Sequence, residues 1–124
     1  MPYVRGHQAV VHEIHGVRFT AHANSGTGSR QIAAWQGEVP AGTVGVPHTV
    51  SHEEVIHVLS GALRFTIDGE SADLGAGDTV IVPAGSLFGL DNLGTDTATT
   101  WVTTSVGLTA TLPDGSTLTP PWAN

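Results

Sequence analysis

Along most of the chain, short segments of alternating apolar and polar residues are separated by turn residues. In one such segment Leu63, Phe65 and Ile67 share one face of an extended strand, and polar residues share the other. Asp68-Gly69 follows directly and favours a tight turn into the next strand. The same pattern predicts strands over residues 9–15, 17–22, 31–39, 44–50, 53–60, 62–68, 70–74, 78–82, 86–91, 97–105 and 108–112.

Residues 51–60 also carry a helix signal. Ser51 and Glu54 have the spacing of a helix capping box. We predict a strand instead, because three of the residues that follow are β-branched and Gly61 ends the run after barely two turns.

The composition indicates an all-β protein. The chain has 16 glycines, 16 threonines and 14 valines but no lysine, so strand and turn formers outweigh helix formers. A length of 124 residues suits one domain over residues 1–124, with a core over about 9–112. The tail from Thr117 to Asn124 contains two adjacent prolines, so we expect it to be irregular and to pack through Trp122.

Charge and missing residue types exclude several functions. A net charge of −7 disfavours nucleic acids and anionic membranes as partners. The absence of cysteine excludes disulfides and thiolate chemistry, and the absence of lysine excludes Schiff bases and phosphate-binding P-loops. No apolar run approaches the ~20 residues of a membrane span, and residues 1–10 lack the apolar core of a signal peptide. We therefore expect a cytoplasmic protein with a small-molecule partner.

Two segments, residues 42–61 and 77–92, resemble the two sequence motifs of the cupin superfamily, G-x5-H-x-H-x3-E-x6-G and G-x5-P-x-G-x2-H-x3-N. The resemblance implies a double-stranded β-helix, also called a jelly-roll barrel, in a small single-domain protein that forms a homodimer. The matching residues are Gly42, His48, Glu54 and Gly61 in the first motif, and Gly77, Pro83, Gly85 and Asn92 in the second.

The metal site that the resemblance implies is degenerate. In the family two histidines, the glutamate and a last histidine converge on one ion, but here Val50 and Phe88 replace the second and last histidines. His52, beside the expected turn, can join His48 and Glu54 in a set of two imidazoles and one carboxylate. That set suits a divalent transition metal such as Fe, Zn or Mn. The alternative, that His52 is a solvated turn residue, stays open.

The same substitutions make the expected pocket apolar. If Trp35 and Trp101 also face inward, together with Val50 and Phe88 they line a cavity suited to a hydrophobic, planar ligand. The alternative is that these aromatic rings only fill the core. The other histidines are expected at the surface or at subunit contacts: His7, His12, His15, His22 and His57.

His48 and Glu54 can also act without a metal, as a general acid and base beside a carbonyl group. Apolar neighbours should raise the pKa of Glu54, whereas a nearby His48 should lower it. The first hypothesis is therefore an enzyme of the cyclase, isomerase or oxygenase type acting on a hydrophobic carbonyl compound, loosely similar to cupin-type polyketide cyclases. The second is a barrel that binds or senses a small molecule without catalysis, and the third is a structural dimer with a vestigial pocket.

Overall fold

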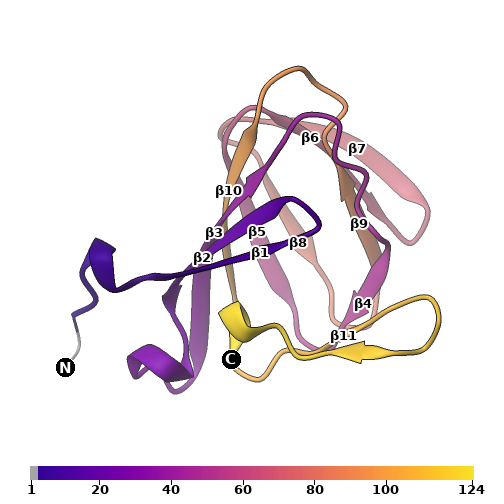
Figure 1. The fold of residues 1–124 in the computed structure, drawn as a ribbon. Helices are drawn as coiled ribbons and strands as arrows, with labels where there is room; N and C mark the ends of the chain where they lie inside the picture. The colour runs from indigo at the N-terminus through magenta and orange to yellow at the C-terminus, as the bar shows by residue number, and fades with distance from the viewer. Residues whose placement is uncertain (1–2) are drawn as a thin grey trace.

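The computed structural model describes residues 3–124 as two six-stranded antiparallel sheets that together form a barrel (Figure 1). The predicted all-β class and jelly-roll fold are confirmed. Residues 1 and 2, where the segment considered as a signal peptide begins, lie outside the described residues. Within residues 3–124, no helix is both long and apolar enough to cross a membrane.

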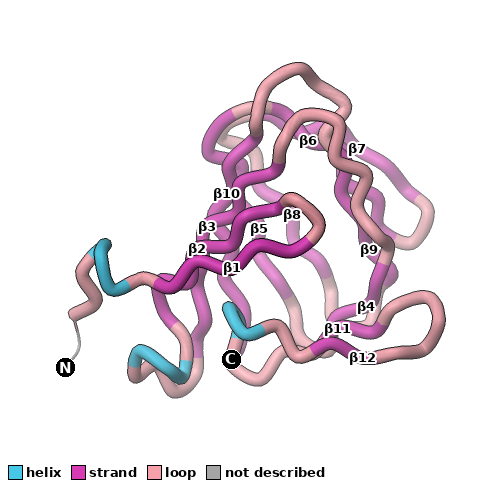
Figure 2. The backbone as a smooth tube through the Cα atoms, viewed as in Figure 1, coloured by secondary structure: helices cyan, strands magenta, loops and turns pink. Residues whose placement is uncertain are grey.

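The first sheet carries the longest strands. In spatial order it contains β1 (Val10–Ile14), β2 (Val17–Ala23), β3 (Ile32–Val39), β10 (Ala98–Ser105), β5 (Glu54–Ser60) and β8 (Thr79–Val82). The second sheet contains β12 (Thr117–Leu118), β11 (Ala110–Thr111), β4 (His48–Val50), β9 (Leu87–Asp91), β6 (Ala62–Ile67) and β7 (Glu70–Gly75). Short 3-10 helices occupy Gly6–Gln8 (η1), Ser25–Thr27 (η2) and Pro121–Ala123 (η3), as the helix colour in Figure 2 shows.

Most predicted strands are present, and residues 51–60 form a strand rather than a helix. The prediction of a strand over 44–50 is wrong for its first half. There, Val44 makes an isolated bridge to Asp91, and regular pairing begins only at His48. Pro47 explains the late start, because it has no N–H to donate to a neighbouring strand.

Alternation along β3, β5 and β10 builds the core. Trp35, Ile56 and Val102 are buried on the inner face of the first sheet, and their sequence neighbours face the other side. At Gly61, between β5 and β6, φ is +77° and an added Cβ would lie 2.8 Å from the Cα of Ala98. Glycine is therefore required at this position of the first motif.

The second motif supports the barrel through its asparagine. Asn92 is fully buried, and its side-chain amide donates to the carbonyls of Val39 and Asp96, each at 2.9 Å. Its side-chain oxygen accepts from the N–H of Gly94 at 3.0 Å. This residue holds the β9–β10 connection in place.

The C-terminal tail differs from the prediction of an irregular segment. It contains β12 and η3, and the tail crosses one end of the barrel (Figure 1). Trp122 is buried and stacks on Phe19, with ring centroids 3.8 Å apart and an interplanar angle of 4°. The side chain of Asn124 donates to the carbonyls of Leu108 and Pro120, so the end of the chain is fixed to the barrel.

Candidate functional site

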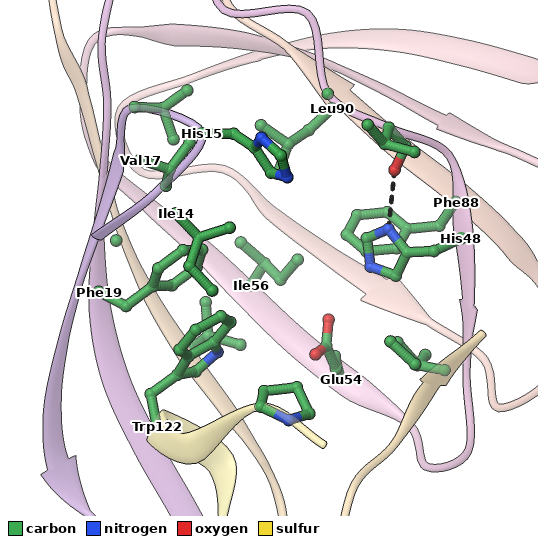
Figure 3. A pocket seen from close by; sticks show the side chains of 18 of the residues that line it. Ile14, His15, Val17, Phe19, His48, Glu54, Ile56, Phe88, Leu90 and Trp122 are labelled. Atoms are coloured by element: carbon green, nitrogen blue, oxygen red, sulfur yellow. Dashed lines mark hydrogen bonds between the residues drawn. The ribbon is translucent and has the colours of Figure 1, made fainter. Parts of the chain in front are cut away.

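The barrel encloses a cavity of about 280 Å³ (Figure 3). Both sheets and the C-terminal tail contribute to its lining, which is mainly aliphatic and aromatic. Among the described residues, the ionisable side chains in this lining are His15, His48 and Glu54. Val44 and Val46 also line it and are exposed, and we call the end of the cavity at His15, Val44 and Val46 the mouth.

Glu54 begins β5 and points into the cavity (Figure 3). The chain bends between β4 and β5, where Ser51 and Thr109 fix the bend: the N–H of Ser51 donates to the Thr109 carbonyl and its hydroxyl accepts from the Thr109 N–H. Glu54 is only 6% exposed, and this burial raises its pKa from 4.5 to about 7. The cause is desolvation of the charged form, and no hydrogen bond from a described residue offsets it.

His48 lies on β4 directly opposite Phe88 of β9. The two rings meet edge to face, with centroids 4.9 Å apart and an interplanar angle of 69°. Nδ1 of His48 lies 2.9 Å from the carbonyl oxygen of Val46. A carbonyl can only accept, so Nδ1 carries the hydrogen, and Nε2 of the neutral ring is free to accept a proton.

Val50 and Phe88, which stand where the family has histidines, are both buried and line the same cavity as His48 and Glu54. Trp35 is buried and lines the cavity as well. Of the two orientations that the sequence left open for it, the structure therefore shows the inward one. The replaced metal ligands therefore leave apolar surface beside the two polar groups.

The prediction that Trp101 faces the cavity is wrong. Its neighbours Thr100 and Val102 line the cavity, so the alternation of β10 places Trp101 on the outer face, where it is 37% exposed. There it packs against His22, with ring centroids 5.2 Å apart.

His52 is not brought together with His48 and Glu54. It lies in the bend outside the cavity lining, and its Nδ1 is 2.8 Å from the hydroxyl of Ser51. Within residues 3–124, no three histidine, aspartate or glutamate side chains are grouped so that they can hold a metal ion. The donor set of the cavity therefore does not fit the three-ligand site predicted from the sequence, because Val50 and Phe88 offer no donor atom.

Two parts of the lining were not expected from the sequence. His15 reaches the cavity from the turn between β1 and β2, and Trp122 and Leu118 reach it from the C-terminal tail. The apolar spacing of the tail gave no strand signal that would place it. For His15, the His15-Gly16 dipeptide between two alternating segments was a signal for a tight hairpin, although not for the cavity beneath it.

His57 faces away from the cavity, as the alternation of β5 predicts. Its Nδ1 lies 2.8 Å from the hydroxyl of Thr79 on the neighbouring strand β8. His57 therefore lies on the same sheet as Glu54 but does not line the cavity.

Comparison with protein families identifies the chain. A model of the cupin domain matches residues 35–105, more than half of the chain, and the protein belongs to the cupin family. This finding confirms the resemblance carried by the two motifs. No protein with a curated description matches the chain.

Solved structures show the same fold. An RmlC-like cupin from Shewanella frigidimarina is 22% identical with a TM-score of 0.73, covering 85% of this chain and 90% of that one. The polyketide cyclase RemF from Streptomyces resistomycificus is 18% identical with a TM-score of 0.74, covering 85% and 79%. KdgF from Halomonas is 21% identical with a TM-score of 0.70, covering 84% and 93%. These similarities show a shared fold.

Proposed function

We propose that this cupin is an enzyme that moves a proton next to the carbonyl group of a small, hydrophobic substrate bound in the barrel. The observation that carries the proposal is Glu54, buried in an apolar cavity with its pKa raised to about 7 and sharing that cavity with His48. General acids and bases work best when their pKa lies near the operating pH. A buried carboxyl group that is this costly to ionise also marks a functional position.

The hydrogen bond of His48 supports a division of roles between the two residues. In the neutral ring of His48, donation from Nδ1 to Val46 leaves Nε2 without a hydrogen, and in this proposal Nε2 takes the proton from the carbon next to the carbonyl. The protonated carboxyl of Glu54 donates its proton to the carbonyl oxygen as the C–H bond breaks. The product is an enol, with an imidazolium at His48 and a carboxylate at Glu54. Return of the proton to the same carbon gives exchange or epimerisation, and its delivery to the far end of a conjugated dienol gives isomerisation. Attack of the enol carbon on a second carbonyl group of the same substrate gives cyclisation.

This proposal routes no step through a metal, because the cavity offers the donor atoms of His48 and Glu54 without the third ligand expected from His52. The oxygenase alternative depends on that three-ligand set. The similarity to a polyketide cyclase supports the choice of a carbonyl substrate through the fold that the two proteins share.

The test is exchange of the α-protons of 1-tetralone, a small bicyclic ketone, in D2O, followed by proton NMR. We expect the protein to accelerate exchange, and Glu54→Gln to lower that acceleration by at least ~100-fold. Glu53→Gln is the matched control, because Glu53 is the exposed neighbour in the sequence. Equal rates for wild type and Glu54→Gln would overturn the proposal.

The pH dependence of exchange separates the two possible roles of Glu54. As an acid, Glu54 must be protonated, so the rate falls about tenfold per pH unit above the Glu54 pKa of about 7. A rate that does not fall above pH 7 would contradict the role of Glu54 as the acid. Binding of 1-tetralone without any exchange would favour the alternative of a non-catalytic binding protein.

The homodimer expected from the family resemblance stays a prediction. Sedimentation velocity at micromolar concentration gives a direct test, with a mass twice that of the 12.8 kDa chain expected. A single species of the monomer mass would contradict it.

A further inference from the structure

The backbone at His15 is unusual in this protein. Among the described residues, His15 (φ 52°) and Asp68 (φ 48°) are the non-glycine residues with positive φ. Each is followed by a glycine and forms a two-residue turn, since Ile14 pairs with Val17 and Ile67 pairs with Glu70. Such turns favour asparagine, aspartate or glycine at the first position, and a non-glycine residue with positive φ is uncommon.

The two turns differ in what stabilises them. The carboxylate of Asp68 accepts from the N–H of Leu87 at 2.9 Å, and its own N–H donates to the Leu87 carbonyl at 2.8 Å. These bonds give Asp68 a structural reason for its position. The imidazole of His15 makes no hydrogen bond or ion pair with any other residue from 3 to 124, and it is exposed at the mouth of the cavity.

The hairpin that carries His15 is held firmly over the cavity. Ile14, Val17 and Phe19 of this hairpin line the cavity, and Phe19 stacks on Trp122 at 3.8 Å. Figure 3 shows the imidazole of His15 directed into the cavity, with Ile56 between it and Glu54 in that view. A non-glycine residue with left-handed backbone on a supported turn, whose side chain has no structural partner, is typical of a functional position.

We propose that His15 is a ligand-contacting residue that binds a second polar atom of the substrate, at the end remote from the carbonyl group held by Glu54. This inference rests on the proposed function, because it takes the cavity as the substrate site. Three polar groups then contact one ligand from three elements: Glu54 from β5, His48 from β4 and His15 from the hairpin turn.

The lining also indicates the charge of this ligand. None of the four arginines lines the cavity, and the chain has no lysine. Arg18, the arginine on the same hairpin, lies 3.8 Å from a carboxylate oxygen of Glu13 and 3.7 Å from one of Glu38. An anionic substrate would lose its hydration without gaining a cationic partner. The lining therefore disfavours an anionic substrate, and a cavity of about 280 Å³ suits one or two rings, slightly below the range for drug-sized ligands.

The experiment compares two neutral probes, 1-tetralone and 6-hydroxy-1-tetralone, which differ by a hydroxyl group on the side of the ring system away from the carbonyl. Binding is measured from the indole N–H signals in NMR titrations. Trp35 and Trp122 line the cavity, so their signals report binding, and Trp101 on the outer face is an internal reference. This readout does not depend on proton exchange.

We expect wild type to bind the hydroxylated probe about five- to tenfold more tightly than 1-tetralone, the effect of one additional hydrogen bond. His15→Gly keeps the turn, because glycine adopts positive φ freely, and should remove this preference. His57→Gln, a change on the outer face, should keep it. The 6-carboxylate of 1-tetralone should bind at least tenfold more weakly than either neutral probe.

An unchanged preference in His15→Gly, or equal binding of both neutral probes by wild type, would overturn the role of His15. Tight binding of the 6-carboxylate would overturn the inference that an anionic substrate is disfavoured. Binding with the expected preference but without proton exchange would contradict the proposed function and leave the role of His15 supported. If neither neutral probe binds wild type, the inference is wrong together with its premise.

Discussion

The two faces of the first sheet present the same kinds of side chain to opposite surroundings. On the inner face, Glu54 and Trp35 are buried around the cavity, whereas on the outer face His57 lies directly opposite the exposed Trp101. The adjacent acids Glu53 and Glu54 show the same contrast, because only Glu54 is buried. Residue type therefore does not decide which groups can carry chemistry. The surroundings decide it, through desolvation that raises the pKa of one carboxyl group.

The largest effect that separates the two faces should come from the tryptophans. Trp35→Ala removes a side chain that is 4% exposed and should lower the free energy of unfolding by about 3–5 kcal/mol. Trp101→Ala removes a side chain that is 37% exposed and should cost less than about 1 kcal/mol. Urea denaturation of both variants measures the difference. Equal losses of unfolding free energy would contradict the burial of Trp35 on the inner face and the exposure of Trp101 on the outer face.

A second test uses the pH dependence of stability. The pKa of Glu54 rises from 4.5 to about 7 on folding, so the folded protein binds more protons in this range and stability falls as pH rises through it. Above pH 7 the loss attributable to Glu54 reaches about 3 kcal/mol. In Glu54→Gln this pH-dependent loss between pH 4 and pH 8 should disappear.

Glu53→Gln is the control for this stability profile. Because Glu53 is exposed, its replacement should leave the wild-type profile between pH 4 and pH 8 unchanged. A profile that is the same in wild type and Glu54→Gln would mean that burial of the Glu54 carboxyl does not destabilise the protein.

A third, smaller effect concerns the positions where the family has histidines. Val50→His combined with Phe88→His restores two ligands on the second sheet, in the same cavity as His48 and Glu54. We expect Zn²⁺ in several-fold excess over its dissociation constant to stabilise this variant by roughly 1–2 kcal/mol, measured by thermal unfolding with and without a chelator. Wild type should respond less, because His48 and Glu54 alone offer two ligands. An equal response of wild type would contradict the donor set described here.

Much of the barrel could be predicted because its signals are local. Alternation places Glu54 and His57 on opposite faces of the strand over 53–60, and the family resemblance implied that Glu54 is the residue that faces in. The two motifs added the connection between distant segments, and the cupin domain match confirms it.

The predictions failed where the position of a side chain depends on contacts between segments that are far apart in the sequence. Trp101 had two possible faces, and only its pairing with β3 and β5 fixes the outer one. The position of His52 depends on the path of the bend, which Thr109, 58 positions after Ser51, holds in place. His15 lines the cavity because the β1–β2 hairpin, at the edge of the first sheet, lies over the cavity. Long-range contacts of this kind leave no pattern in a single sequence.

The most direct test of the account is the titration of the Glu54 side-chain carboxyl carbon by NMR, with Glu53 followed in the same spectra. A midpoint of about 7 for Glu54 is predicted, since the carboxyl group lies in an apolar cavity with no described hydrogen bond to stabilise its charge. A midpoint near the ordinary value of 4.5 would show that the carboxyl group is solvated, and would contradict both the proposed acid and the cavity built around it.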